Sequence, residues 1–286
     1  MVNLMILSGI VLLTCIISSK IFYKWGVPVL LVFIIIGMLF GSDGIGGIYF
    51  DNYNITYSLS SIALVFIMFY GGFCTEWKKA RSVAIPSIML STLGVIITAG
   101  LTGLFCHFVL KTSIFEGLLL GCIVASTDAA SVISILRSRN LKLKNNIDTL
   151  VEFESGSNDP TAYMLTSVML IFITSNESVG IGLLGMIFKQ IVFGVTVGLF
   201  LSKLAVFILR KVEFEIEGLY PIFTITVAIL AYSISEFLGG NGYLSVFIAG
   251  IVMGNSKIPH KKSLNHFFDG LSWIMQIILF FMLGLL

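Results

Sequence analysis

Charge is scarce in this sequence. Only 11% of its 286 residues are charged, 57% are hydrophobic and the mean hydropathy is +1.03. Soluble domains carry roughly 25% charged residues, so the shortage excludes a soluble globular domain. The formal net charge is only +2, and no basic tract is interleaved with aromatic residues, so we expect no nucleic-acid partner.

Cysteine is scarce as well. The four cysteines lie in or beside apolar runs, with no Cys-x-x-Cys pair and no histidine at ligand spacing: Cys15, Cys74, Cys106 and Cys122. A disulfide framework or a zinc site is therefore not expected, and nothing indicates a cofactor. Residues 4–19 also lack the basic start and the small-x-small cleavage site of a signal peptide, which predicts a retained first helix.

Long apolar runs take the place of charge. Because a spanning helix needs about 20 mostly apolar residues, these runs predict an all-α polytopic membrane protein. The predicted spans number ten and lie at roughly 4–22, 27–41, 58–74, 83–110, 114–136, 148–174, 181–209, 219–238, 243–254 and 267–286.

Basic residues alternate between the connections of these spans. Of the 17 basic residues, 14 lie in the odd-numbered connections, at Lys20, Lys24, Lys78, Lys79, Arg81, Arg137, Arg139, Lys142, Lys144, Arg210, Lys211, Lys257, Lys261 and Lys262. The positive-inside rule places these connections in the cytoplasm and the N-terminus outside. The chain carries no organelle signal, so we expect a bacterial plasma (inner) membrane.

A few acidic residues lie inside the predicted spans. Asp128 is about mid-way along 114–136, and Glu154 and Asp159 lie in 148–174. A carboxylate at the bilayer centre costs about 2.5–3.5 kcal/mol on insertion scales, so such residues normally face a polar cavity or a partner. Glu116 and Glu236 are nearer to span ends, and we expect their side chains to reach the interface.

The acidic residues of 148–174 belong to a polar stripe. On a helix, Glu154 and Asn158 stack one turn apart, as do Ser155 and Asp159. Pro160 cannot donate a hydrogen bond to the carbonyl one turn before it, which leaves that oxygen free beside the carboxylates. Carboxylate, amide, hydroxyl and carbonyl oxygens suit a hard cation, and the many neutral oxygens favour a monovalent one.

The preceding span carries the complementary feature. Ser126, Thr127 and Asp128 interrupt an apolar helix with residues that prefer N-caps to helix interiors. A break there would let Asp128 cap the second half of the helix and leave an oxygen of Thr127 open to an ion. In the alternative, Ser126 and Thr127 bond back to the preceding turn, and Asp128 is a structural cap or pairs with another helix.

These two motifs together resemble a known family. Thr127-Asp128, followed by the run Glu-Ser-Gly-Ser-Asn-Asp-Pro at 154–160, is similar to the monovalent cation:proton antiporter superfamily, in its NhaP/NHE-type branch with Asn before Asp. The run is most similar to bacterial potassium/proton antiporters of the cell-volume-regulation (CvrA-like) group. Gly71-Gly72 and the run Phe-Asp-Gly-Leu-Ser-Trp at 268–273 add to the resemblance.

The resemblance implies a fold of thirteen helices in two inverted repeats, with a dimerisation domain, a mobile core and a homodimeric assembly. Applied to this chain, it gives a transmembrane domain at 1–286 that is truncated at its C-terminus. The first repeat would cover about 1–174, a linker helix about 181–209, and the start of the second repeat 219–286. The second crossing helix of the family would be missing.

The resemblance also implies roles. Asp159 would bind either the cation or the proton, and Asn158 would orient the site. Ser155, Glu154 and Thr127 would be ligands or their support, with Asp159, Ser155 and Thr127 around the cation. Asp128 would be the residue at the helix break. The chain would then be a transporter and not an enzyme. It would exchange K⁺ or Na⁺ for H⁺ across the plasma membrane by alternating access, with cation and proton competing at Asp159.

Three other interpretations remain open. A cation channel would need a ring of carbonyls or charges from symmetric subunits, and no Thr-Val-Gly-Tyr-Gly filter occurs. An intramembrane aspartyl protease would use Asp128 and Asp159 together, but the residues before them are Thr and Asn, not those of its Tyr-Asp and Gly-x-Gly-Asp motifs. In the third, the chain is an inactive or structural fragment of an antiporter.

Overall fold

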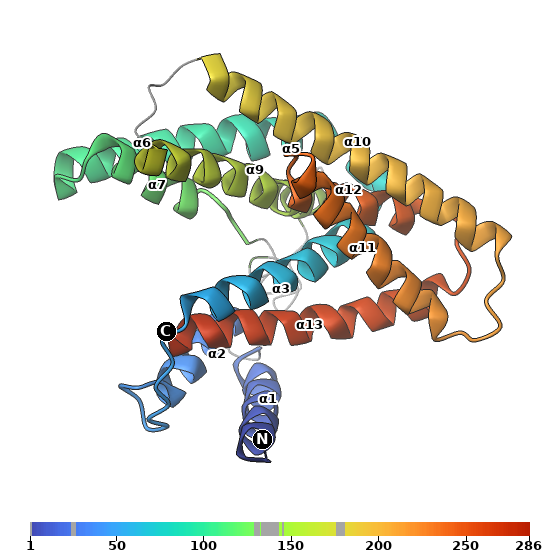
Figure 1. Ribbon diagram of the computed structural model, residues 1–286, viewed down its shortest axis with the longest axis horizontal. Coiled ribbons are helices and arrows are strands. Elements are labelled where there is room, and N and C mark those ends of the chain that lie inside the picture. Colours follow the sequence, from blue (N-terminus) through green and yellow to red (C-terminus); the bar gives the residue numbers. More distant parts are fainter. Residues whose placement is uncertain (1, 24–26, 129–131, 133–142, 145, 176–180) are drawn as a thin grey trace. The chain divides into compact units, whose positions relative to one another are not determined.

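The computed structural model describes residues 2–23, 27–128, 132, 143–144, 146–175 and 181–286. This part of the chain is helical, apart from turns and one isolated bridge between Gly41 and Ile48 (Figure 1). In chain order the elements are α1 (Val2–Tyr23), α2 (Val29–Phe40), α3 (Tyr53–Cys74), α4 (Trp77–Ala80), α5 (Ala84–Met89), the π-helical turn η1 (Leu90–Gly94), α6 (Val95–Leu110), α7 (Ile114–Val124), α9 (Ile147–Ser175), α10 (Ile181–Lys211), α11 (Leu219–Phe237), α12 (Gly242–Asn255) and α13 (Lys261–Leu285).

Each predicted span contains a helix, and most ends agree within a few residues. The span at 83–110 is built from α5, η1 and α6. α13 starts earlier than predicted, so Lys261 and Lys262 belong to its first turn and not to a loop. The short helix α4 was not expected. In the span at 114–136, α7 ends at Val124, and most of the chain between Asp128 and Leu143, including the basic connection at 137–142, lies outside the described residues.

Length and composition separate these helices. Within the described residues, six helical segments are long and apolar enough to cross a membrane: Met5–Phe22, Tyr53–Cys74, Ala84–Leu110, Gly185–Lys211, Leu219–Phe237 and Lys261–Leu285. Three apolar helices are shorter: α2, α7 and α12. α9 has the length, 29 residues, but not the apolar composition, because it carries the polar stripe. The chain is a multi-pass membrane protein.

α6 illustrates how such a helix meets lipid. One face buries small residues, among them Ala99, Gly103 and Cys106. The opposite face exposes large apolar side chains, with Leu101 65% and Phe108 74% exposed. A soluble protein rarely leaves a stripe like this in water, whereas hydrocarbon accepts it at no cost.

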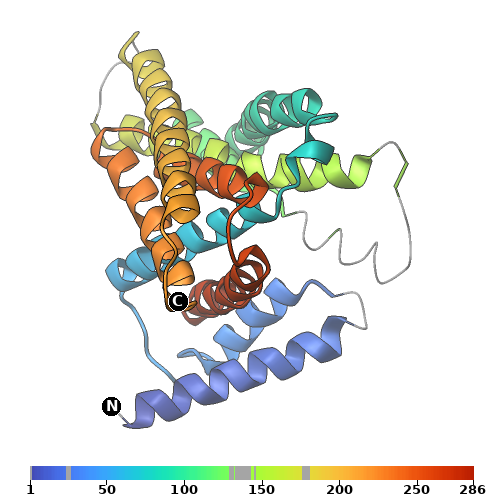
Figure 2. The ribbon, with the colours of Figure 1, turned by 90° about the vertical axis from the view of Figure 1, so that its right-hand side faces the viewer.

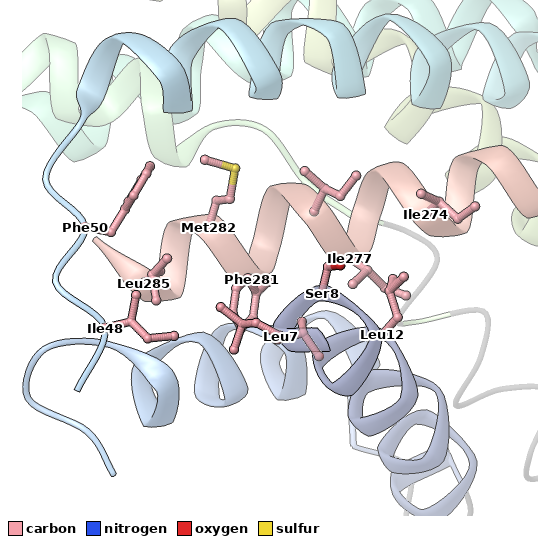
Figure 3. Close-up of a pocket in the computed structure, with 12 residues that line it drawn as sticks. Leu7, Ser8, Leu12, Ile48, Phe50, Ile274, Ile277, Phe281, Met282 and Leu285 are labelled. Atoms are coloured by element: carbon pink, nitrogen blue, oxygen red, sulfur yellow. The ribbon is translucent and has the colours of Figure 1, made fainter. Parts of the chain in front are cut away.

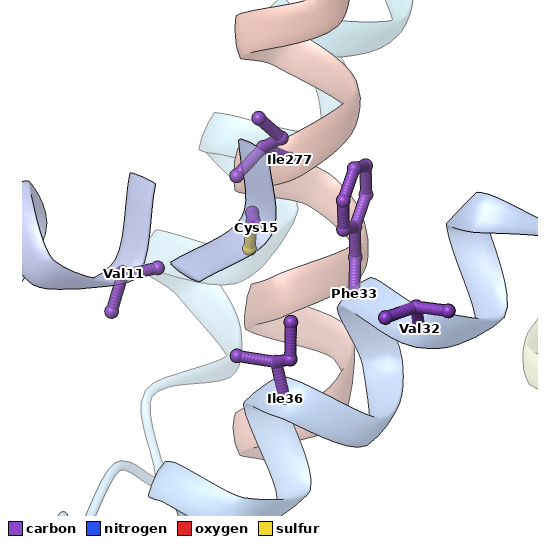
Figure 4. Close-up of a cluster of buried hydrophobic side chains, with 6 residues drawn as sticks. All are labelled: Val11, Cys15, Val32, Phe33, Ile36 and Ile277. Atoms are coloured by element: carbon purple, nitrogen blue, oxygen red, sulfur yellow. The ribbon is translucent and has the colours of Figure 1, made fainter. Parts of the chain in front are cut away.

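The chain divides into two compact units. Residues 1–67, 130–142 and 266–286 form the first unit, and 68–129 with 143–265 form the second. In the first unit, α1 lies beside α2 (Figure 2). A buried cluster from α1, α2 and α13 forms its core, with the side chains drawn in Figure 4: Val11, Cys15, Val32, Phe33, Ile36 and Ile277. Gly37 and Gly284 bring the backbones of α2 and α13 so close that a Cβ on either would collide with the other helix.

The first unit also contains an apolar cavity of about 360 Å³ between α1, α13 and the segment after α2 (Figure 3). It is lined by Leu7, Ser8, Val11, Leu12, Ile48, Phe50, Ile274, Ile277, Ile278, Phe281, Met282 and Leu285. The hydroxyl of Ser8 donates to the carbonyl of Met5 in its own helix at 2.9 Å, so the cavity has an apolar wall throughout.

The second unit is organised around α12. This helix is buried around most of its circumference and packs against α9, α10 and α11 (Figure 1). α6 and α7 pack against each other, and both contact α9. Small residues make these crossings close. A Cβ on Gly72 of α3 would collide with the carbonyl of Phe247 in α12, and one on Gly250 would meet that of Phe69 in α3. α9 contacts α6 and α7 as well as α10 and α12.

Candidate functional site

α7 ends in the middle of its predicted span. Its first turn is fixed by a capping box, in which Glu116 N–H donates to Ser113 Oγ at 3.2 Å and Ser113 N–H donates to Glu116 Oε2 at 3.0 Å. Its last turn closes with Ala125 N–H on the carbonyl of Gly121 at 3.0 Å. Residues 126–128 are not helical. The predicted interruption is confirmed, and the helix that Asp128 was expected to cap lies outside the described residues.

The polar stripe on α9 is confirmed as well. α9 continues without a break through Pro160. Asn158 is fully buried and donates from Nδ2 to Glu154 Oε1 at 3.1 Å, one turn before it. Ser157 is separate from this stripe, because its hydroxyl donates back to the carbonyl of Phe153 at 2.7 Å.

Thr127 joins the non-helical segment at 126–128, called the unwound segment below, to the polar stripe on α9. Asn158 Nδ2 donates to Thr127 Oγ1 at 2.6 Å, and Thr127 Oγ1 lies 3.4 Å from Glu154 Oε2, to which it donates. Ser155 Oγ donates to the backbone carbonyl of Thr127 at 2.8 Å. Residues 27 to 31 positions apart in the chain therefore form one hydrogen-bonded cluster. The alternative in which Thr127 bonds back to its own helix is not observed.

Asp159 meets the same segment through Ser126, whose hydroxyl donates to Asp159 Oδ1. Sequence reasoning placed Ser126 only at the helix break and missed this contact. The available signal was the run of polar residues within an apolar span. That signal does not show which way each side chain points. Asp128, the remaining predicted site residue, is exposed beside the cluster and takes part in an interaction of its own.

The cluster leaves one buried acceptor without a hydrogen-bond partner among the described residues. Asn158 donates to Thr127 and Glu154 through Nδ2, whereas its Oδ1 is buried and accepts no bond from this part of the chain. A buried acceptor left unpaired costs about 1–3 kcal/mol. Two carboxylates, an amide oxygen, hydroxyls and a backbone carbonyl thus gather within one small volume. That donor set suits a hard cation of low charge or a proton.

Glu116 and Glu236, which were expected to reach the interface, are both exposed and each accepts a hydrogen bond at the start of a helix. Glu116 is the capping residue of α7. Glu236 Oε1 accepts the N–H of Gly242 at 2.8 Å, at the start of α12. Both carboxylates satisfy the donors left open in the first turn of a helix, which is a structural role that a position near a span end also permits.

The fold and this cluster define a class: a multi-pass helical membrane protein with carboxylates and neutral oxygens gathered where one helix is interrupted. The chain belongs to the sodium/hydrogen exchanger (transmembrane) family, whose model matches residues 9–286.

Curated relatives are similar along the whole chain. The K(+)/H(+) antiporter NhaP of Alkalimonas amylolytica is 39% identical over 286 residues, which is 100% of this chain and 50% of the relative. The K(+)/H(+) antiporter NhaP2 of Shewanella sp. (strain ANA-3) is 38% identical over 282 residues, covering 94% of this chain and 46% of the relative. The chain therefore spans about half the length of the curated relatives it matches.

A solved structure shares the fold. The sodium proton antiporter MjNhaP1 from Methanocaldococcus jannaschii superimposes with a TM-score of 0.84 at 24% sequence identity, over 100% of this chain and 71% of that one. The similarity confirms the expected antiporter fold along this chain.

Proposed function

We propose that the chain is the cation-binding part of a secondary antiporter, which exchanges a monovalent cation for H⁺ across the plasma membrane. The observation that carries this proposal is the cluster in which Ser126 and Thr127, where α7 has ended, bond to Glu154, Ser155, Asn158 and Asp159 of α9. Intramembrane carboxylates are expensive and mark ion pathways. An unwound segment at that depth is tolerated where it lines a polar cavity.

Competition at one carboxylate accounts for coupling. Asp159 holds either a proton or the cation, because the charge of the carboxylate can be neutralised by only one of them at a time. Ser155 and Thr127 complete the cation's oxygen shell together with Asp159, and Glu154 and Asn158 support it. If the core crosses the membrane only with Asp159 neutralised, each cation moved one way requires a proton moved the other way.

Potassium is the proposed cation. The two relatives described above, at 38% and 39% identity, are both named K(+)/H(+) antiporters. The oxygen donors of the site accommodate K⁺ or Na⁺, and the choice between them depends on the size of the cavity around Asp159. Na⁺ therefore belongs in the test as the competing substrate.

The larger organisation is also proposed. Residues 1–174 would form the first inverted repeat, 181–209 the linker helix, and 219–286 the start of the second repeat. The basic connections would face the cytoplasm and the N-terminus would lie outside. Two copies would form a homodimer, as the family resemblance implies.

Cation-driven proton flux in proteoliposomes tests the proposal. A trapped pH dye would report the response to gradients of K⁺, Na⁺ and Li⁺, for this chain and for a version extended to the length of its relatives. We expect proton movement that a K⁺ gradient drives and that reverses with the gradient. Cation flux without coupled proton movement would replace the antiporter by a channel. An inserted, folded protein with no flux at either length would contradict transport altogether.

A further inference from the structure

The connection between α11 and α12 enters the interior of the second unit. α11 ends in a Schellman turn, with Gly240 N–H on the carbonyl of Ser235 at 2.7 Å and Gly239 N–H on that of Glu236 at 2.9 Å. Gly239 adopts the left-handed conformation, at φ +75°, that this turn requires. Asn241 comes next and is only 2% exposed. Asn241 lies in the short connection that the sequence predicts between the spans 219–238 and 243–254.

Asn241 holds three helices together. Its N–H donates to the carbonyl of Gln190 in α10 at 3.0 Å. Its Oδ1 caps α12 by accepting the N–H of Leu244 at 3.0 Å. Its Nδ2 donates to the carbonyl of Pro160 in α9 at 2.9 Å, across 81 positions of the chain.

The bond to Pro160 lies next to the candidate site. Pro160 comes directly after Asp159, so its carbonyl belongs to the stretch of backbone that carries the reactive carboxylate. On the other side, Asp159 meets Ser126 of the unwound segment. The position of the carboxylate is therefore fixed from two directions, by a side-chain contact toward α7 and by a backbone contact toward α12.

We infer that Asn241 is a positioning residue for the cation site. By tying the Pro160 carbonyl to α10 and α12, its Nδ2 sets where the Asp159 carboxylate stands relative to Thr127. This inference rests on the proposed function, because it assigns Asn241 a part in cation binding at Asp159.

The two ends of the Asn241 amide can be separated by substitution. Asn241→Ser retains a residue that caps helices well but has no group that reaches Pro160. Asn241→Asp keeps the size of the side chain and the capping oxygen and is compatible with a helix N-terminus, but it replaces the Nδ2 donor by a charged oxygen that the carbonyl of Pro160 repels. The second variant covers the case in which the first does not fold.

Asn255 offers a matched control at the other end of α12. Its Nδ2 donates to the carbonyl of Thr75 at 2.8 Å, and its Oδ1 accepts the N–H of Trp77 at 2.8 Å. Like Asn241, it joins α12 to other parts of the second unit through both ends of its amide. These bonds lead to the start of α4 and the residues before it, whereas that of Asn241 leads to α9. Asn255→Ser therefore removes comparable bonds away from the site.

The experiment measures KM and kcat for K⁺-driven proton flux in the wild-type chain and in these variants. Cation-induced stabilisation against thermal unfolding gives a second value for affinity that does not require transport. Loss of one well-placed hydrogen bond corresponds to roughly a tenfold effect. We expect Asn241→Ser and Asn241→Asp to raise KM about tenfold, with kcat within about twofold, and Asn255→Ser to leave KM unchanged.

The remaining outcomes separate the two proposals. If the Asn241 variants lower the amount of folded, active protein but leave KM and the cation-induced stabilisation unchanged, Asn241 is structural and the inference fails alone. If Asp159→Asn retains exchange, or if neither the chain nor its extended version transports cations or is stabilised by them, the proposed function fails and the inference fails with it.

Discussion

At the scale of residues, the site is defined by the serine and threonine hydroxyls that form hydrogen bonds to a segment other than their own helix. In most of the helices, serine and threonine hydroxyls donate to a backbone carbonyl of the preceding turn, as Ser157 does to Phe153 and Thr161 does to Ser157. Ser155 is different, because its hydroxyl crosses to the carbonyl of Thr127. A hydroxyl that joins two helices orients the site, whereas one that bonds its own helix contributes little to it.

This difference gives a prediction for neighbouring serines. Ser155→Ala removes an oxygen of the proposed cation shell together with its bond to Thr127, so we expect KM for K⁺ to rise about tenfold. Ser157→Ala should leave KM within about twofold, since only an intrahelical bond is lost. Steady-state flux in proteoliposomes measures both. Equal effects in the two variants would remove Ser155 from the site.

Asn158 gives a second prediction at this scale. Its Nδ2 holds Thr127 and Glu154 at once. Asn158→Leu removes these bonds and leaves Thr127 Oγ1 and Glu154 Oε1 without the amide donor, so we expect exchange to fall at least about tenfold and the protein to lose about 1–3 kcal/mol of stability. Flux and thermal unfolding would be measured on the same preparation. Wild-type exchange at wild-type stability would contradict the arrangement described.

At the scale of elements, close helix crossings decide the architecture, and adjacent glycines test this. A Cβ on Gly72 would collide with the carbonyl of Phe247, whereas one on Gly71 would meet nothing within 4 Å. We expect Gly72→Ala to destabilise the protein by about 1–3 kcal/mol and Gly71→Ala to be neutral or stabilising by up to about 1 kcal/mol. Unfolding in a mild detergent measures both changes, and the same loss in each would argue against a tight α3–α12 crossing.

Elements were also the level at which the sequence was most informative. Apolar runs predicted a helix in every span, and three cap-forming residues in a row predicted the end of α7 near Thr127. Helical spacing placed Glu154 and Asn158 together. Periodicity could not show that Ser126 reaches Asp159 or that Asn241 reaches Pro160, because both contacts join segments that are distant in the chain. The sequence pattern of a short polar connection also predicts a loop whether the connection lies in water or is buried in the protein.

At the scale of the whole molecule, the distribution of basic residues predicts a topology that can be measured. Cys74 is exposed and the other three thiols are buried, so a Cys74→Ser background is suitable for labelling single added cysteines. In intact cells, an impermeant maleimide should label Asp51→Cys, between α2 and α3, and should miss Ser82→Cys, beside α4. In inverted membrane vesicles the pattern should reverse. Labelling of Ser82→Cys from outside would show that the orientation is the reverse of the predicted one.

The most direct test of the proposed mechanism is whether cation and proton compete at Asp159. KM for K⁺ would be measured at several pH values on the side of cation entry, in the wild-type chain, in Asp159→Asn, and in Asp148→Asn at the exposed start of α9 as a control. In the range where the site is mostly protonated, competition for one carboxylate predicts that KM rises about tenfold for each unit the pH falls while kcat stays constant. Asp159→Asn should be inserted and inactive, and Asp148→Asn should behave as wild type. A KM that does not change with pH, or exchange that survives in Asp159→Asn, would contradict competition at this carboxylate.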